Sequence, residues 1–155
     1  MRRVNLASPT FRYDENDPLP FRAGLFRPGP ELGAQRTGMS VYELPPGQAI
    51  CPYHYEYGEE EWLVVLEGRP TLRTPEGSEQ LEPFDAVFFP RGPEGAHGVS
   101  NATGESVRVL MLSEIAVPTA TVYPDSNKIG IWTGNRDDDL MVRRDAGLEY
   151  YDGEA

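Results

Sequence analysis

Short apolar runs alternate with turn residues along most of this chain. Runs of roughly four to eight mostly apolar residues are separated by clusters of Gly, Pro, Asn or Asp. Between positions 37 and 113 they recur about every 8 to 12 residues, a spacing typical of strands in a sandwich or barrel. Few windows place apolar residues at the helical period of 3.6. The pattern therefore predicts a turn-rich all-β domain.

The individual runs give the expected strands and loops. Gly and Pro are abundant, with 16 and 15 residues, about a fifth of the chain against a usual ~12%. Loops at 75–78 and 103–105 are expected to close hairpins. The predicted strands are 37–44, 53–57, 61–67, 70–74, 79–82, 85–89, 96–102 and 106–113, followed by 117–123 and 128–133.

Two of these runs are apolar on both of their faces, and in one of them Val107, Val109 and Met111 point away from Leu110 and Leu112. In Trp62-Leu-Val-Val-Leu66 the odd and even positions point to opposite sides of a strand, yet all are hydrophobic. A strand of this kind needs cover on its outer face. We expect that cover from the N-terminal segment, a second sheet or a partner subunit. A homodimer with twofold symmetry is the simplest assembly of the last kind.

The 155 residues fit one domain, which we divide into three segments. Residues 1–36 are rich in Pro, Gly and Arg and include aromatic residues, so we expect an arm that packs on the barrel or on a partner. Residues 37–114 carry the predicted β-barrel. Residues 115–155 are expected to form C-terminal strands and a tail.

Charge and composition exclude several classes of partner. The chain has 14 basic and 25 acidic residues and a net charge of −11, which repels nucleic acid and anionic membrane surfaces. It contains no run of ~18 apolar residues that could span a bilayer. The first residues lack the apolar stretch of a secretory signal, and a single cysteine, Cys51, cannot form an internal disulfide. A cytoplasmic location is the expectation.

The two histidines of the chain lie near carboxylates in positions that predict a metal site. His54 and Glu56 project from the same face of one expected strand. Glu61 returns to that point after the turn at Gly58, and His97 arrives on a distant strand. Two imidazoles and two carboxylates suit a divalent first-row ion, and two ionised glutamates would balance its charge.

Each of these residues also has a purely structural interpretation. Both histidines could be hydrogen-bonded strand residues, although an unpartnered Glu61 in so apolar a strand would be costly. Glu56 could be a ligand, a general base beside the metal, or the partner of an arginine.

Neighbouring residues are expected to point elsewhere or to have other roles. Cys51 has the opposite strand parity to His54, although Pro52 weakens that inference. Glu59 and Glu60 are expected to face solvent. Arg91 could meet an anionic substrate or remain in solvent. On the other side of the strand that carries His54, we expect a sheet or subunit contact made by Tyr53, Tyr55 and Tyr57. The side chains that could point into the barrel, with their orientation left open, are Asn101, Met111 and Tyr42.

These stretches resemble the two motifs of the cupin superfamily, G(X)5HXH(X)3-4E(X)6G and G(X)5PXG(X)2H(X)3N. The first histidine and the glutamate of the first motif correspond to His54 and Glu61, and the second motif is matched by Pro90, Gly92, His97 and Asn101. The resemblance covers roughly residues 41–113, and the whole chain is similar to single-domain bacterial cupins. It implies a double-stranded β-helix, or jelly-roll, barrel with an N-terminal arm and a C-terminal extension.

Three positions depart from the family pattern. Glu56 stands where cupins usually have a second histidine, and Phe84 stands where the second motif usually opens with glycine. Six residues rather than five separate Gly47 from His54. The change at Glu56 bears on function, because it could keep a metal with a harder ligand set or mark a site that binds metal weakly or not at all.

The resemblance implies a metal-dependent enzyme that acts on a small oxygenated molecule inside the barrel, of oxygenase, isomerase or lyase type. His54, Glu61 and His97 would hold one divalent ion per chain, with iron, manganese, nickel and zinc not distinguished. Glu56 would be the fourth metal ligand or the catalytic base. The alternatives are a non-catalytic cupin that binds a small molecule, and a barrel that has lost its metal.

Overall fold

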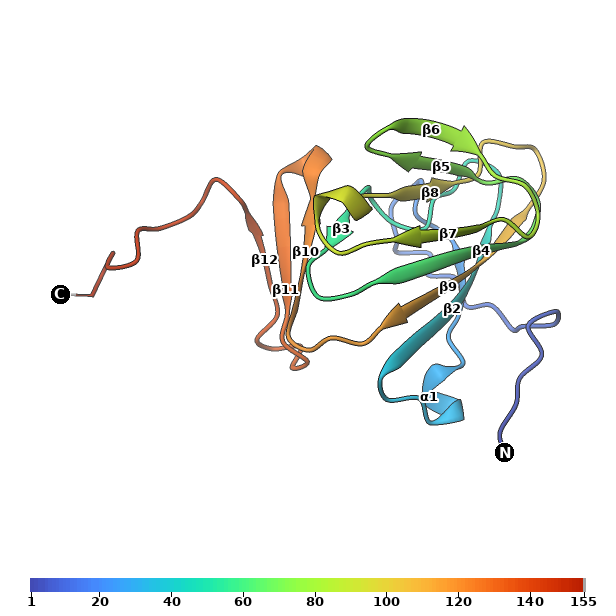
Figure 1. The fold of residues 1–155 in the computed structure, drawn as a ribbon, viewed down its shortest axis with the longest axis horizontal. Coiled ribbons are helices and arrows are strands. Elements are labelled where there is room, and N and C mark those ends of the chain that lie inside the picture. Colours follow the sequence, from blue (N-terminus) through green and yellow to red (C-terminus); the bar gives the residue numbers. More distant parts are fainter. Residues whose placement is uncertain (155) are drawn as a thin grey trace.

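The computed structural model describes residues 1–154, and its regular secondary structure consists almost entirely of antiparallel strands (Figure 1). The all-β prediction is confirmed. In chain order the elements are β1 (Gly24–Phe26), α1 (Gly29–Leu32), β2 (Thr37–Leu44), β3 (Tyr55–Glu56), β4 (Glu61–Glu67), β5 (Thr71–Thr74), β6 (Gly77–Gln80), β7 (Ala86–Phe89), the 3-10 turn η1 (Pro93–Gly95), β8 (Gly98–Ser100), β9 (Val107–Glu114), β10 (Thr119–Tyr123), the 3-10 turn η2 (Pro124–Ser126), β11 (Lys128–Trp132) and β12 (Leu140–Arg143).

The strands form three sheets. The largest has the order β1-β2-β9-β4-β7, and a three-stranded sheet has the order β6-β5-β8. These two sheets form the jelly-roll barrel of Figure 1. The third sheet, β12-β11-β10-β3, stands at one end of that barrel, where the short strand β3 joins it. This end of the barrel is also where both histidines lie.

The barrel is filled by aliphatic side chains from the inner faces of the two sheets. Leu63 and Val65 of β4 are fully buried and cluster with Leu72 of β5 and Val99 of β8. Each such side chain stabilises the fold by about 1.5–3 kcal/mol relative to an exposed one. Because side chains point alternately to the two faces of β4, Leu63 and Val65 both face the barrel interior.

The outer face of the large sheet remains partly exposed. Trp62 is 47% exposed and Phe88 is 41% exposed, and their rings pack against each other at 5.0 Å. The cover predicted for this face is therefore incomplete within residues 1–154.

The N-terminal segment lies against the edge of the barrel. β1 pairs with β2, and Phe26 is opposite Val41 in that ladder. Arg12 in turn makes two backbone hydrogen bonds of 3.0 and 2.9 Å with Leu25. This pairing sets the position of the residue that follows β1, Arg27.

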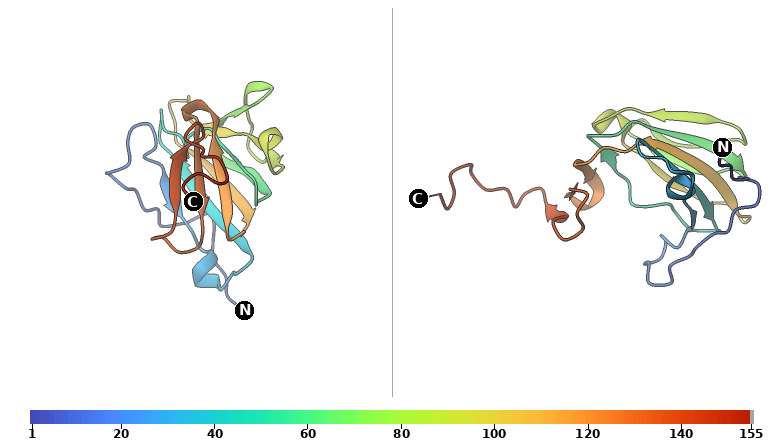
Figure 2. Two further views of the ribbon diagram at one scale, coloured as in Figure 1. Left: turned by 90° about the vertical axis from the view of Figure 1, so that its left-hand side faces the viewer. Right: turned by 90° about the horizontal axis from the view of Figure 1, so that it is seen from below.

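The C-terminal residues after β12 extend away from the barrel, as the perpendicular views of Figure 2 show. Within residues 1–154, α1 has only four residues, and no helix combines the length and the apolar character that crossing a membrane requires.

Candidate metal centre

The two histidines are held opposite each other by the backbone. His54 lies just before β3 and His97 lies between η1 and β8, and the two form an isolated antiparallel bridge. The amide of His54 donates to the carbonyl of His97 at 3.0 Å, and the reverse bond is 2.8 Å long. Their ring centroids are 4.6 Å apart. A local pairing of two distant segments thus brings both imidazoles to one point.

Both imidazoles have the same protonation pattern. Nδ1 of His54 is 3.0 Å from the carbonyl oxygen of Pro52, and Nδ1 of His97 is 2.9 Å from that of Gly95. A carbonyl can only accept, so each Nδ1 must carry the proton and donate it. Both Nε2 atoms are therefore left with a free lone pair, the arrangement found in metal-bound histidine. Phe89 stacks on the His97 ring at 3.8 Å and fixes its plane.

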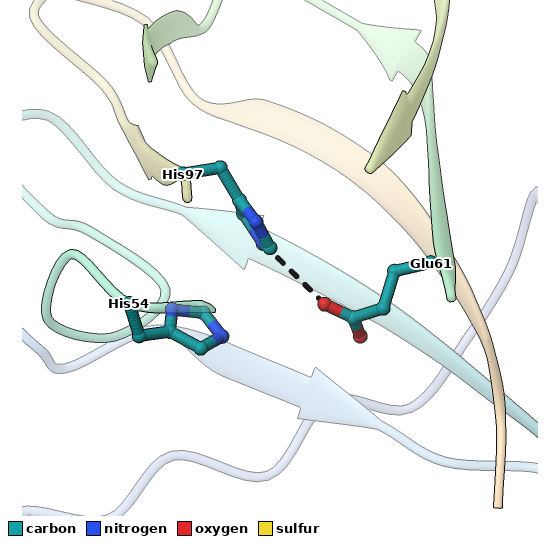
Figure 3. Close-up of side chains that lie close together, drawn as sticks. All are labelled: His54, Glu61 and His97. Atoms are coloured by element: carbon teal, nitrogen blue, oxygen red, sulfur yellow. Dashed lines mark ion pairs between the residues drawn. The ribbon is translucent and has the colours of Figure 1, made fainter. Parts of the chain in front are cut away.

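Glu61, the first residue of β4, completes the group. It lies on the inward face of that strand, two and four residues before the buried Leu63 and Val65. One ligand atom from each of His54, Glu61 and His97 falls within 4.8 Å of the other two. Figure 3 shows the Glu61 carboxylate pointing at the His97 ring, with Oε2 3.4 Å from Nε2.

The contact between Glu61 and His97 fits a cation between the two groups. An unprotonated Nε2 and an ionised carboxylate are both acceptors, so their lone pairs repel unless a proton or a cation lies between them. Two ligand atoms that each lie ~2.0–2.1 Å from a tetrahedral ion are about 3.3 Å apart. The observed separation of 3.4 Å is close to that value. The donor set and the spacing of this pair therefore fit a divalent ion.

Burial determines the charge states of these groups in the absence of metal. It lowers the pKa of His97 to about 4, with a further lowering from His54, and it lowers the pKa of His54 as well. Burial, assisted by the charge of Glu59, raises the pKa of Glu61 to about 7. Both histidines are thus neutral at pH 7, as metal ligation requires, and the contact of His97 with Glu61 is not a charged pair.

Glu56 lies beside the group but is not part of it. Its Oε1 is 3.5 Å from the hydroxyl of Thr121, and its buried Oε2 has no hydrogen-bond partner among the described residues. Burial and the carboxylates of Glu61 and Glu59 raise the pKa of Glu56 to about 9. An uncharged carboxyl group with a free oxygen is therefore exposed to the same cavity as the three converging ligands.

The four residues line a cavity of about 250 Å³. Its remaining wall combines apolar side chains with hydroxyl groups and one arginine. These residues include Ile50, Val99, Met111, Ser40, Tyr42, Ser113 and Arg27. The sequence left the orientations of Tyr42 and Met111 open, and in the structure both residues line the cavity.

Two expectations for residues near His54 are wrong. Glu59 lines the cavity rather than facing solvent, because its carboxylate accepts the amide of Ala116 at 3.3 Å and is held inward, whereas Glu60 is exposed as expected. Cys51 also lines the cavity, with Sγ 3.5 Å from Nδ1 of His54. Residues 50–53 form bends rather than a strand, so strand parity does not apply to them.

The arginine of the cavity is not the one that the sequence suggested. Arg91 forms an exposed ion pair with Glu114 and takes the solvent-side alternative. Arg27, which lies 27 residues before His54, lines the cavity instead. The expectation that residues 1–36 pack on the barrel was the only signal for it, and that signal did not identify the residue.

Three other motif positions have structural roles. Asn101 is buried and donates to the carbonyls of Leu44 and Glu105 at 2.8 and 2.7 Å, so it fastens a turn rather than contacting the site. Gly92 has φ of 82°, a left-handed conformation that favours glycine. Phe84, where cupins usually have glycine, also has a positive φ, 73°. Phe84 thus holds a backbone conformation that glycine adopts without strain.

Comparison with known proteins assigns the class. Residues 40–113 match the family model of the cupin domain. These residues therefore form a cupin domain. A comparison with curated protein sequences gives no significant match.

Solved structures extend the similarity beyond the domain. A sugar phosphate isomerase of the cupin superfamily from Silicibacter pomeroyi has 21% identity over 97% of this chain and 98% of its own, with a TM-score of 0.81. The polyketide cyclase RemF from Streptomyces resistomycificus has 27% identity over 77% of this chain and 83% of its own, with a TM-score of 0.61. The first similarity shows that the terminal segments also follow a known arrangement.

Proposed function

We propose that this cupin is a metal-dependent enzyme that moves protons on a small oxygenated molecule inside the barrel, in an isomerase or lyase reaction. The observation that carries the proposal is the convergence of two unprotonated Nε2 atoms and one carboxylate at the wall of a cavity of about 250 Å³. Three ligands on one side leave the remaining coordination positions facing the cavity.

His54, Glu61 and His97 would hold one divalent ion. Two nitrogens and one oxygen suit iron, manganese, nickel or zinc. When bound, the ion would polarise a carbonyl or hydroxyl oxygen of the substrate. The Nδ1 hydrogen bonds of both histidines then keep the rings oriented, and the stacking of Phe89 restricts His97 further.

Glu56 would be the acid–base residue. It lines the same cavity, and its Oε2 has no hydrogen-bond partner among the described residues, so the protonated carboxyl group is free to donate a proton to the substrate and take one back. This arrangement supports proton-transfer chemistry more than oxygen chemistry, which needs no such group. The cyclase activity named for the RemF protein is also compatible with acid–base chemistry in a cupin barrel.

Glu56 also supports the alternative function, a cupin that binds a small molecule without converting it. A carboxyl group that remains protonated contributes no negative charge to a metal site. In that case the cavity would retain its ligand unchanged.

The test measures metal and turnover separately. Elemental analysis of untagged protein should give close to one iron, manganese, nickel or zinc per chain. Glu61→Gln should lower the metal affinity at least about tenfold, because it removes one of three ligands. Glu60→Gln is the matched control, since Glu60 is the exposed neighbouring residue. Full metal occupancy in Glu61→Gln would disprove the site.

Turnover is read from proton exchange. Hydroxyketones and sugar phosphates are incubated with the metal-loaded protein in D2O, and NMR detects deuterium that enters a carbon position. Glu56→Gln should retain metal and lose exchange by at least about a hundredfold. Metal-loaded protein that binds these compounds and exchanges none would favour the binding function.

We also propose that two copies associate through the outer face of the large sheet. The half-exposed and mutually packed rings of Trp62 and Phe88 support this assembly. Sedimentation at micromolar concentration should show a dimer, and Trp62→Glu should shift it to monomer. A cytoplasmic location remains a prediction.

A further inference from the structure

Arg27 is positioned at the cavity by the N-terminal segment. It follows β1 directly, and the pairing of Phe26 with Val41 places it opposite Ser40 of β2. Its Nε is 3.5 Å from Oγ of Ser40, and its charge also acts on Tyr42, which is another residue of the cavity wall. A segment outside the cupin domain thus contributes a guanidinium group to the site.

A second cavity adjoins the first. It has a volume of about 230 Å³ and lies between α1 and the paired ends of β2 and β9. The two cavities share five lining residues, which are Arg27, Gly38, Ser40, Glu59 and Ser113. The two cavities therefore meet at these residues, with the converging histidines in the wall of the first cavity and Arg27 at the junction.

Arg27 provides the positive charge of this junction, and Glu59 provides a negative one. It is the only lysine or arginine among the described residues that line either cavity. Of the acidic residues in the second cavity, Glu114 is paired with Arg91, and Glu59 accepts the amide of Ala116. Arg27 itself has no carboxylate within 4.0 Å in residues 1–154.

The groups around Arg27 can complete an anion site. Ser40 and Ser113 line both cavities, and each hydroxyl can donate one hydrogen bond. Gly38 is opposite Ser113 in the β2–β9 ladder, and a Cβ at Gly38 would come within 2.8 Å of Oγ of Ser113. The glycine therefore leaves that hydroxyl accessible. A planar guanidinium with flanking hydroxyls is suited to the oxygens of a phosphate or a carboxylate.

We propose that Arg27, together with Ser40 and Ser113, binds an oxyanion group of the substrate. The substrate would then be a small oxygenated compound with a phosphate or a carboxylate at the end away from His54, Glu61 and His97. The assignment of an oxygenated reactive end near His54, Glu61 and His97 rests on the proposed function. The assignment of an oxyanion group at Arg27 does not. Arg27 would act by fixing the substrate in one orientation, which places its reactive end at the ligand group.

The test compares Arg27→Met with Arg36→Met. Arg36 is exposed, lies in the same segment and lines neither cavity, so it controls for the loss of one positive charge. Inorganic phosphate, glycerol 3-phosphate and acetate are titrated into each protein by calorimetry, once metal-free and once loaded with zinc. Thermal unfolding confirms that both variants fold.

We expect Arg27→Met to weaken the binding of at least one oxyanion about tenfold or more, in metal-free and in zinc-loaded protein, because a charged hydrogen bond is lost. Arg36→Met should leave the Kd unchanged within about twofold. The probe that loses affinity distinguishes a phosphate-bearing substrate from a carboxylate-bearing one.

Equal Kd values for wild type and Arg27→Met, or an effect confined to zinc-loaded protein, would overturn the proposal, since the anion would then bind elsewhere or on the metal. Anion binding that depends on Arg27 and persists in His97→Ala would support it even if the metal site failed. The oxyanion site and the proposed function are therefore tested independently.

Discussion

The two ends of the barrel interior are built on the same strands and differ in almost every physical property. Along the inner face of β4, Glu61 at one end is followed by Leu63 and Val65 toward the other. The same holds for β9, where Ser113 and Met111 line the cavity and Val109 lies in the aliphatic core. The alternation of side chains decides which face of the sheet a residue occupies. The position of the residue along the strand decides whether it packs in the aliphatic core or lines the ligand cavity.

The apolar end stabilises the fold, whereas the ligand end carries unsatisfied groups. At the ligand end, two acceptors face each other at 3.4 Å and one buried carboxyl oxygen has no partner. Such groups cost stability unless an ion or a substrate compensates them. The difference indicates that the ligand end is organised for binding rather than for folding.

The largest effect should come from the apolar end. Leu63→Ala should lower the free energy of unfolding by about 2–5 kcal/mol, because it leaves a cavity in a fully buried cluster. The metal affinity of the folded protein should change less than about threefold. Urea unfolding and competition with a chelator measure the two quantities. A metal affinity that falls in proportion to stability would show that the two ends are not separable.

Acid should weaken metal binding through Glu61 first. The pKa of Glu61 is about 7 in the metal-free site, so a proton competes with the ion below that pH. Affinity should be constant above pH 7 and fall roughly tenfold per pH unit between 7 and 5 through Glu61, whereas His97 takes up a proton only near pH 4 because its pKa is about 4. Chelator competition from pH 8 to 5 measures the slope. A flat profile would remove Glu61 from the ligand set.

Alkaline pH should destabilise the metal-free protein through Glu56. The pKa of Glu56 in the folded protein, about 9, exceeds the ordinary 4.5. Its contribution to the free energy of unfolding is therefore complete below pH 4.5 and is lost as the pH rises toward 9. His97, whose pKa is lowered, has the opposite effect, confined to the range below 6.5. Between pH 7 and 9 the free energy of unfolding should fall by up to about 1.4 kcal/mol per pH unit. Glu56→Gln should abolish the slope, and a persisting slope would assign it to another group.

The smallest effect concerns a turn at the apolar end. Phe84 has φ of 73° and is 80% exposed, and its amide donates to the carbonyl of Val65. Phe84→Gly should raise the free energy of unfolding by up to about 1 kcal/mol, because glycine adopts this φ without strain, although it also loses more backbone entropy on folding. Thermal unfolding of the metal-free protein measures it. Metal affinity should be unaffected, and a change there would connect the two ends.

The sequence by itself determined the main strands, the side of each strand that its alternating residues face, and the candidate metal ligands. The predicted strands 37–44 and 61–67 coincide with β2 and β4, because alternation and flanking turn residues are local signals. The convergence of His54, Glu61 and His97 was also predicted. The hairpin loop predicted at 75–78 was two residues too long, since Thr74 pairs with Gly77 across a turn of only two residues.

Only the tertiary structure decided what else reaches the cavity. Cys51 lies in a bend and Glu59 in irregular backbone, where side-chain direction follows the path of the backbone rather than a period of two. Arg27 reaches the site through the pairing of β1 with β2, a contact between segments that share no sequence pattern. The protonation of both imidazoles depends on carbonyls fixed by the local folding of residues 52 and 95. Periodicity determines a regular strand, whereas irregular backbone and long-range pairing are determined by the packing of the whole chain.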